Sequence, residues 1–317
     1  MTLSPKSCCA LPVALRLWCL PLATGVLLSA CGGGGGSAGP ANQPPVAAAK
    51  LGSEAVLNAS TLFDTTGTAD PDGSIANRSW TYGDGQSGSV DNHTYTATGS
   101  YTATLTVTDN IGASTSTIVP VTVAKCSSSG TQAAKLSPFT PLCMQTSRGE
   151  LVLEIYTVQA PVSAANFLRY VDEGFYSGLL FHRVMPGFVI QSGGFLPGPV
   201  VKATTHPAIA LENNNTLKNW QYTLAMARTD EPNTATATSQ FFINLLDNHS
   251  LDYDPARASP NGYAVFGQVI SGTTVVDAIG AVATARATVA ATSSSPAFVL
   301  TDVPVQDIVI RSIVRMP

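Results

Sequence analysis

Charged residues are scarce in this sequence, and the basic ones form no cluster. Only 11% of the 317 residues are charged, with 16 Lys and Arg against 20 Asp and Glu, a net charge of -4. A nucleic-acid-binding protein needs basic side chains gathered to neutralise phosphates, so no nucleic-acid partner is expected. Metal-binding signatures are also missing, because the four histidines form no His-Glu-x-x-His and the cysteines no Cys-x-x-Cys. No metal site is therefore predicted.

The N-terminus carries an apolar run that is too short to span a bilayer. The run Leu17 to Leu28 follows Lys6 and Arg16, a pattern typical of a secretory signal over residues 1–30. The text Leu28-Ser29-Ala30-Cys31 resembles the bacterial lipobox, in which the chain is cut before the cysteine and its thiol is lipidated. Cys31 is thus the expected lipid acceptor. An uncleaved anchor or an ordinary signal peptide is the alternative.

The residue after Cys31 bears on location. In the lipoprotein family a glycine such as Gly32, in place of aspartate, implies sorting to the outer membrane. The expected location is the cell envelope, with the chain lipid-anchored on the periplasmic side of the outer membrane. The membrane is then a partner through the N-terminal lipid.

Only two cysteines remain beyond the signal and Cys31. Cys126 and Cys143 are separated by sixteen residues. In an oxidising compartment they could form a disulfide that stabilises the fold by about 3 kcal/mol through restriction of the unfolded chain. Two free thiols are the alternative.

Composition divides the rest of the chain into domains. Residues 31–45 are rich in glycine and form a flexible tether, because such a segment cannot bury apolar area. Residues 46–124 carry short Thr- and Val-rich strands, of which 101–108 alternates most clearly, with Leu105 and Val107 on one face. Turn residues separate these strands at spacings expected of a small β-sandwich.

The same segment resembles a PKD domain, an immunoglobulin-like β-sandwich. The resemblance covers nearly the whole segment, and such modules act as spacers or bind proteins and glycans, so the ligand of this one is left open. The matching text is Asp70-Pro71-Asp72-Gly73-Ser74-Ile75, Trp80, Tyr82-Gly83-Asp84-Gly85, His93-Thr94-Tyr95, Gly99, Tyr101 and Leu105-Thr106-Val107-Thr108-Asp109.

Residues 125–143 contain Ser, Gly and Pro and are predicted to be a linker, and a second domain occupies 144–317. Pro161 begins a predicted helix with an apolar stripe that ends at Gly174, and a second short helix is expected at 274–279. Many strands with two helices favour an α+β or barrel architecture. The strands are predicted at 148–156, 179–184, 187–191, 222–227, 241–245, 264–269 and 308–314.

Four stretches of the second domain resemble the signature of cyclophilins, the peptidyl-prolyl cis-trans isomerases, in their bacterial branch. They occur in the family's order. They are Phe181-His182-Arg183-Val184-Met185-Pro186-Gly187-Phe188-Val189-Ile190-Gln191-Ser192-Gly193-Gly194-Phe195, Leu224-Ala225-Met226-Ala227-Arg228, Ser239-Gln240-Phe241-Phe242-Ile243-Asn244 and Tyr263-Ala264-Val265-Phe266-Gly267.

The resemblance implies a closed eight-stranded antiparallel β-barrel capped by two helices, so the chain as a whole is expected to be mainly β. It also implies an isomerase acting on X-Pro bonds in proline-containing polypeptides, and a monomer is expected. Arg183 is the implied catalytic cation, with Phe188 and Gln191 beside it, and Gln191 and Gln240 orienting it and the peptide. The implied substrate-binding residues are Val189, Ala227, Arg228, Gln240, Phe242, Leu251 and Tyr263, with Ala227 and Arg228 offering the backbone edge for the substrate.

This chemistry explains why no cofactor is expected. Rotation about an imide bond must overcome a barrier of about 18–20 kcal/mol, but no bond to another atom forms, so neither a nucleophile nor a cofactor is required. A guanidinium can hydrogen-bond the imide nitrogen as its lone pair localises. The alternative function is a non-catalytic module that binds proline peptides or adheres to a partner.

Two features depart from the family pattern. Ser250 precedes Leu251 where eukaryotic members have a tryptophan and bacterial relatives an aromatic residue, which predicts weak cyclosporin binding. The stretches 229–239 and 281–302 are longer than the family minimum, and we expect them to alter which peptides fit the site.

Overall fold

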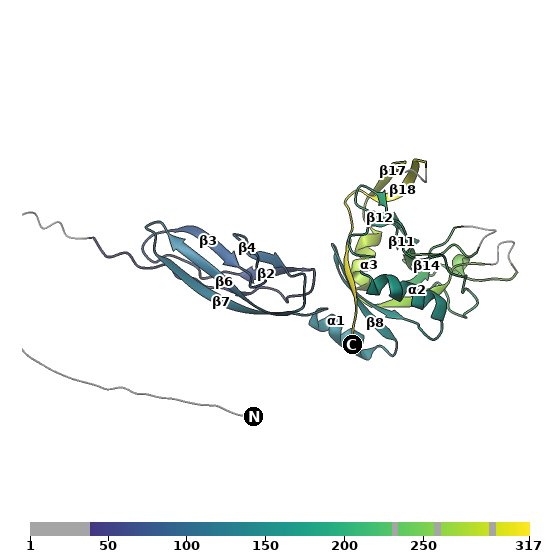
Figure 1. Ribbon diagram of the computed structural model, residues 1–317, viewed down its shortest axis with the longest axis horizontal. Coiled ribbons are helices and arrows are strands. Elements are labelled where there is room, and N and C mark those ends of the chain that lie inside the picture. The colour runs from purple at the N-terminus through teal and green to yellow at the C-terminus, as the bar shows by residue number, and fades with distance from the viewer. Residues whose placement is uncertain (1–38, 230–233, 257–260, 292–295) are drawn as a thin grey trace, which may run out of the picture. The chain divides into compact units, whose positions relative to one another are not determined.

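The computed structural model of the chain describes residues 39–317 except 230–233, 257–260 and 292–295 (Figure 1). The predicted signal peptide, Cys31 and most of the tether therefore lie outside the described residues. Residues Asn42–Pro317 form one compact unit. Among the helices described, none is both long and apolar enough to cross a membrane.

The segment predicted as a β-sandwich forms two antiparallel sheets. One sheet has the order β1-β2-β5 and the other β4-β3-β6-β7. Their side chains meet in an apolar core in which Trp80, Tyr95, Leu105 and Val107 are fully buried. The predicted alternation along 101–108 is therefore confirmed. The strands are β1 (Lys50–Leu51), β2 (Ser60–Asp64), β3 (Ile75–Thr81), β4 (Ser87–Gly88), β5 (Asn92–Thr94), β6 (Gly99–Asp109) and β7 (Ser114–Val123).

The segment predicted as a linker, residues 125–143, is largely structured. Residues 125–143 contain the helix α1 (Ser128–Leu136) and the start of the strand β8 (Thr140–Thr146). The Ser127 hydroxyl caps the helix by accepting a bond from the Gly130 N–H at 3.0 Å. A helix forms here because Gln, Ala, Lys and Leu, which favour helices, follow the Ser- and Gly-rich start.

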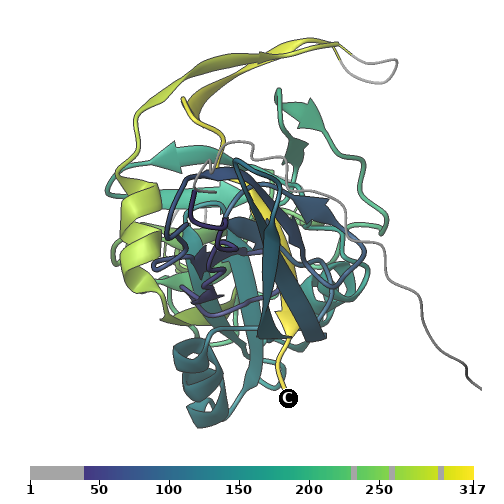
Figure 2. The same cartoon turned by 90° about the vertical axis from the view of Figure 1, so that its left-hand side faces the viewer.

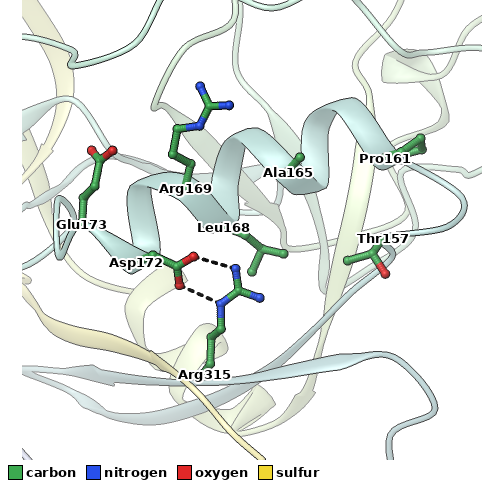
Figure 3. A pocket seen from close by; sticks show the side chains of 8 residues that line it. All are labelled: Thr157, Pro161, Ala165, Leu168, Arg169, Asp172, Glu173 and Arg315. Carbon is green, nitrogen blue, oxygen red and sulfur yellow. Dashed lines mark hydrogen bonds and ion pairs between the residues drawn. The ribbon is translucent and has the colours of Figure 1, made fainter.

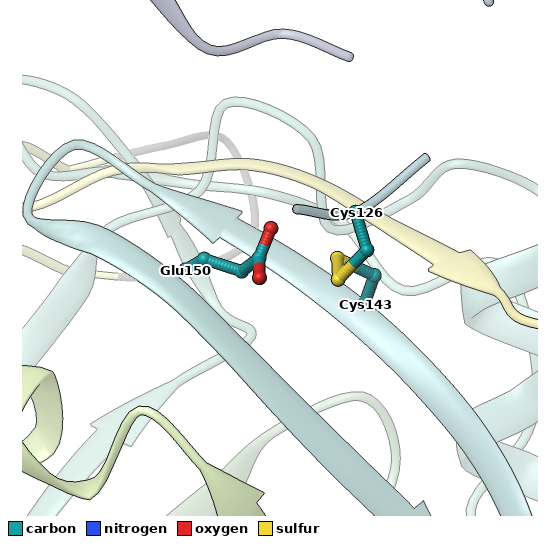
Figure 4. A group of neighbouring side chains, drawn as sticks. All are labelled: Cys126, Cys143 and Glu150. Carbon is teal, nitrogen blue, oxygen red and sulfur yellow. A yellow bond between two sulfur atoms is a disulfide. The ribbon is translucent and has the colours of Figure 1, made fainter. Parts of the chain in front are cut away.

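The two cysteines of this segment are bonded to each other. The sulfur atoms of Cys126 and Cys143 are 2.06 Å apart, so the loop before α1 is joined to β8 (Figure 4). Glu150 lies beside the disulfide and accepts hydrogen bonds from Ser127 and Gln145. In the described part of the chain, Cys126, Cys143 and Glu150 are the one group of Cys, His, Asp or Glu side chains close enough together to hold a metal ion. The two sulfurs are bonded to each other, so they offer no thiolate ligand.

The second domain is built on one eight-stranded antiparallel sheet. Its order is β10-β11-β15-β14-β16-β9-β8-β19. The two edges meet through a bridge between Leu180 and Val309, supported by the bond from Phe181 N–H to Ile308 O at 2.8 Å. The sheet therefore curls into a closed barrel. Its strands are β8, β9 (Gly149–Ile155), β10 (Phe181–Met185), β11 (Val189–Ser192), β14 (Thr223–Met226), β15 (Phe241–Asn244), β16 (Val265–Ser271) and β19 (Ile310–Arg315).

Two helices cover the inner face of the sheet. The helices α2 (Pro161–Asp172) and α3 (Thr273–Gly280) share an apolar core with residues such as Leu151, Leu153 and Phe241. Gly174 follows α2 with φ 65°, the left-handed conformation in which glycine ends a helix. The predicted mainly β fold class is confirmed, with α1 as a helix that the sequence did not predict.

Two hairpins and one short helix lie outside this sheet and were not predicted. The longer hairpin extends from the end of α3 (Figure 2). The rings of Phe195 and Phe298, one from each hairpin, have centroids 6.3 Å apart. The remaining elements are β12 (Phe195–Leu196), β13 (Val200–Val201), the 3-10 helix η1 (His249–Leu251), β17 (Thr284–Val289) and β18 (Phe298–Pro304).

Candidate active site

Strand register aligns the predicted site residues in one row across the sheet. Arg183 on β10 is opposite Gln191 on β11, and Gln191 is opposite Phe242 on β15. Phe242 is in turn opposite Ala225 on β14. Side chains of directly paired residues lie on the same face of a sheet. Ala225 and Phe242 belong to an apolar cluster separate from the barrel core, so the row lies on the outer face of the barrel.

A tight turn places the next residue of the site. Pro186 and Gly187 connect β10 to β11, and Gly187 has φ 71°. The N–H of Phe188 donates to the Met185 carbonyl at 3.0 Å, which closes the turn. Proline followed by a glycine with positive φ is the pattern of a type II turn. Phe188 follows this turn and lies beside the row.

Arg183 is held on several sides. Its Nη1 donates to Gln191 Oε1 at 3.4 Å, and its Nη2 lies 2.6 Å from the sulfur of Met185. Its Nε is 4.0 Å from a carboxylate oxygen of Asp302. The side chain is 37% exposed, so the guanidinium remains within reach of a ligand.

Most of the predicted site residues line a cleft of about 420 Å³. Its lining combines apolar side chains, of which Val189 and Phe242 are almost fully buried, with the side chains of Arg183 and Arg228. Thr229 is the one lining residue that the sequence analysis did not name. The lining residues are Arg183, Phe188, Val189, Gln191, Ala227, Arg228, Thr229, Phe242, Leu251 and Tyr263.

Gln240 is the one predicted site residue outside this cleft. It lines an adjoining hollow of about 210 Å³ together with Gln191. The Gln191 Nε2 donates to Gln240 Oε1 at 2.9 Å while its Oε1 accepts from Arg183. Gln240 therefore contacts the cleft through Gln191 and fixes the orientation of that amide.

Arg228 and Tyr263 also line the cleft, and their side chains contact each other. The guanidinium carbon of Arg228 lies 5.0 Å from the centre of the Tyr263 ring, within the range of a cation–π contact. The Nε of Arg228 donates to the Gly262 carbonyl at 2.9 Å. Tyr263 also packs edge-on against Phe242, with ring centroids 5.5 Å apart.

Buried asparagines that the sequence analysis did not identify hold the apolar wall in place. The amide of Asn248 donates to the Phe188 carbonyl at 2.8 Å and to Asn244 Oδ1 at 2.8 Å. The amide of Asn219 donates to the Leu251 carbonyl at 3.1 Å. This network joins the turn that carries Phe188 to the 3-10 helix that carries Leu251. A lone Asn has no spacing signal, so only the structure shows it.

His182 is buried next to Arg183 and stays neutral. It is 2% exposed, and its ring lies 4.5 Å from that of Phe195. Burial, assisted by the charge of Arg183, lowers the pKa of His182 to about 4. The imidazole is therefore uncharged at neutral pH and does not add a second cation to the site.

A second pocket lies beside α2, away from the predicted residues. Its volume is about 540 Å³, and none of the predicted catalytic or binding residues lines it. Figure 3 shows Arg315 and Asp172 joined by two hydrogen bonds below the helix, at 2.6 and 2.7 Å. The guanidinium there is already paired, so it is less available to a ligand than that of Arg183.

Comparison with known proteins decides the family. The model of the cyclophilin type peptidyl-prolyl cis-trans isomerases matches residues 142–314. The chain belongs to this family. A PKD domain model matches residues 42–123, so the cyclophilin domain is preceded by a PKD domain.

Bacterial cyclophilins are closely similar to the second domain. Peptidyl-prolyl cis-trans isomerase B of Escherichia coli K12 is 45% identical over 168 residues, which are 53% of this chain and 94% of that protein. The isomerase cyp18 of Streptomyces antibioticus is 47% identical over 169 residues, again 53% and 94%. An isomerase of Acinetobacter baylyi is 50% identical over 141 residues, 44% of this chain and 72% of that protein.

Proposed function

We propose that this cyclophilin isomerises X-Pro bonds of exported, proline-containing polypeptides and that Arg183 is its catalytic group. The observation that carries the proposal is the row in which Arg183, Gln191 and Phe242 lie opposite one another, beside the 420 Å³ cleft. A cation thus borders a cleft that also presents apolar side chains and has room for a pyrrolidine ring and the neighbouring peptide units.

The reaction needs a hydrogen-bond donor more than a nucleophile. Twisting the imide bond breaks its resonance and localises a lone pair on the proline nitrogen. A guanidinium N–H of Arg183 donates to that nitrogen in the twisted state and not in the planar states. A charge-assisted bond of this kind contributes about 1.5–3 kcal/mol, which corresponds to roughly tenfold to a hundredfold in rate.

Orientation supplies the rest of the acceleration. The proline ring packs on Phe188, Phe242 and Leu251, while the chain beyond it lies along Ala227 and Arg228. Holding the ring and the preceding residue separately favours rotation about the bond between them. The asparagine network keeps Phe188 and Leu251 in place, so little reorganisation is needed when the substrate binds.

Proline-peptide isomerisation by wild type and Arg183→Ala tests the proposal. The rate can be followed by a protease-coupled assay or by exchange spectroscopy, with kcat and KM measured separately. Arg183→Ala is expected to lower kcat roughly tenfold to a hundredfold. Arg169→Ala, which removes an exposed arginine of α2, is the matched control and should keep the wild-type rate.

The same experiment separates the enzyme from a binding module. A module that only grips proline peptides would bind them equally well before and after the substitution and would show no catalysed rate in either protein. Equal catalysed rates for wild type and Arg183→Ala would remove Arg183 from the mechanism.

We propose further that the isomerase is tethered to a membrane of the cell envelope through a lipid on Cys31 and acts there as a monomer. The support is the sequence pattern at Leu28 to Cys31. The PKD domain then serves as a spacer between the tether and the isomerase. Labelling with radioactive palmitate in a bacterial host should mark wild type and not Cys31→Ser, and equal labelling of both would contradict the tether.

A further inference from the structure

The strand β18 brings a carboxylate to the catalytic arginine. Asp302 Oδ2 lies 4.0 Å from Arg183 Nε, although the two residues are 119 positions apart. Within the described residues, Asp302 is the only acid with an ion-pair contact to Arg183. The two side chains are 33% and 37% exposed, so the contact borders the solvent at the edge of the cleft.

A bulge in the hairpin directs Asp302 toward the site. Ala285 of β17 is opposite Val303, and Ala287 is opposite Leu300, so two residues of β18 face one residue of β17. Asp302 is one of these two residues. A bulge of this kind turns a side chain out of the ordinary alternation of the strand. The hairpin thereby presents a carboxylate to β10, a different sheet.

The carboxylate oxygen is itself oriented. The hydroxyl of Thr301, the other residue of the bulge, donates to Asp302 Oδ2 at 2.7 Å. This is the same oxygen that faces Arg183 Nε. The neighbouring hydroxyl therefore orients the carboxylate that forms the ion pair with the guanidinium.

The contacts of Arg183 complement one another. Gln191 accepts from Nη1, Met185 contacts Nη2, and Asp302 faces Nε on the third side. A guanidinium is planar, so contacts at all three nitrogens fix its plane as well as its position. Among the described residues, Asp302 supplies the one polar contact given to Nε, and this contact helps to set the tilt of the plane.

We propose that Asp302 is a positioning residue, which fixes the plane of the Arg183 guanidinium so that its N–H groups meet the imide nitrogen of the twisted substrate. This inference rests on the proposed function of Arg183. It assigns a role to the hairpin β17–β18, most of which falls in the stretch 281–302. Because the contact is partly exposed, the expected effect is modest.

Steady-state kinetics of Asp302→Asn tests the inference. We expect kcat to fall about two- to fivefold with little change in KM, because the substrate still fits the cleft while the donor is less well oriented. Asp302→Glu should recover part of the loss. Asp307→Asn removes a charge from an exposed position nearby and should leave kcat unchanged.

A double-mutant cycle shows whether Asp302 acts through Arg183. In an Arg183→Ala background, Asp302→Asn should not lower the residual rate further. An equal fold-loss in both backgrounds would mean a structural role and overturn the inference. An unchanged or higher kcat for Asp302→Asn alone would overturn it too.

Salt and spectroscopy provide independent measurements on protein with an intact fold. At 1 M NaCl, where charges are screened within about 3 Å, the wild-type kcat should approach that of Asp302→Asn, and Asp307→Asn should follow the wild type. The Arg183 Nε–H resonance of the wild type should shift over the same salt range, and an unmoved resonance would contradict the contact. If wild type were inactive, the proposed function itself would fail. An active wild type with an impaired Arg183→Ala and a normal Asp302→Asn would remove only the positioning role.

Discussion

The outer face of the eight-stranded sheet is covered at one end and open at the other. Over β8 and β9, α1 and the disulfide bury Cys143 and Val152 in a small apolar cluster with Ala134. Over β11, β15 and β14, Val189, Ala225 and Phe242 form a similar apolar surface. That surface borders the cleft. The alternation along the strands therefore places apolar residues on the outer face at both ends of the sheet. They become core where another segment covers them and a binding site where none does.

Loss of the disulfide should have the largest effect on stability, and only at the covered end. The double variant Cys126→Ser with Cys143→Ser is expected to lower the free energy of unfolding by about 3 kcal/mol, because the unfolded chain regains the freedom of the closed loop. Urea denaturation measures this change, and isomerase activity in the absence of urea should stay at the wild-type level. A large loss of activity would show that the covered end also supports the cleft.

His182 should make the open end sensitive to acid. Its pKa is about 4 in the folded chain against 6.5 in the reference state, so between these values the unfolded chain takes up a proton that the folded chain does not. The contribution is fully present above pH 6.5 and falls by about 3 kcal/mol as the pH drops to 4.

Unfolding measured at several pH values checks this expectation. His182→Gln should show a shallower loss of stability than wild type over this range, whatever its stability at pH 7. Parallel curves for the two proteins would mean that His182 does not titrate as its burial requires.

A matched pair of substitutions should separate the two ends of the outer face. Val152→Ala is expected to cost about 1–3 kcal/mol of stability with no change in kcat/KM, because Val152 is buried under α1. Phe242→Leu keeps most of its volume and should cost less than about 1.5 kcal/mol, but it should lower kcat/KM about two- to tenfold by removing the ring that faces the substrate. Denaturation and kinetics on both variants measure the contrast, and similar profiles would contradict the division.

The smallest effect is expected where the open end lacks an aromatic wall. Ser250 is exposed and precedes Leu251 of the cleft. Ser250→Trp should add an aromatic contact and raise cyclosporin affinity up to about tenfold, which corresponds to roughly 1.4 kcal/mol. Binding to immobilised or labelled cyclosporin tests this, with Ser250→Ala as the control. Equal cyclosporin affinity of the wild type and both variants would show that Ser250 is not the cause of weak cyclosporin binding.

Much of the site was predictable because its residues lie in short motifs that resemble those of the cyclophilins. Pro186 and Gly187 specify a turn from their own backbone preferences, and the turn places Phe188. Nine of the ten predicted catalytic and binding residues line one cleft, and Gln240 joins it through Gln191. The asparagine network and Asp302 were not predicted, since their partners lie far away in the sequence.

The sequence by itself determined the alternation of the strands and the helix that begins at Pro161, because each depends on local backbone preference and on the period of apolar residues. The residues that can face the cleft were implied by the resemblance of short motifs to those of the cyclophilins. The tertiary structure alone decided which part of the outer face is covered, where α1 lies and that a bulge in β18 brings Asp302 to Arg183. Those features depend on contacts between distant segments, whose energies no local pattern records.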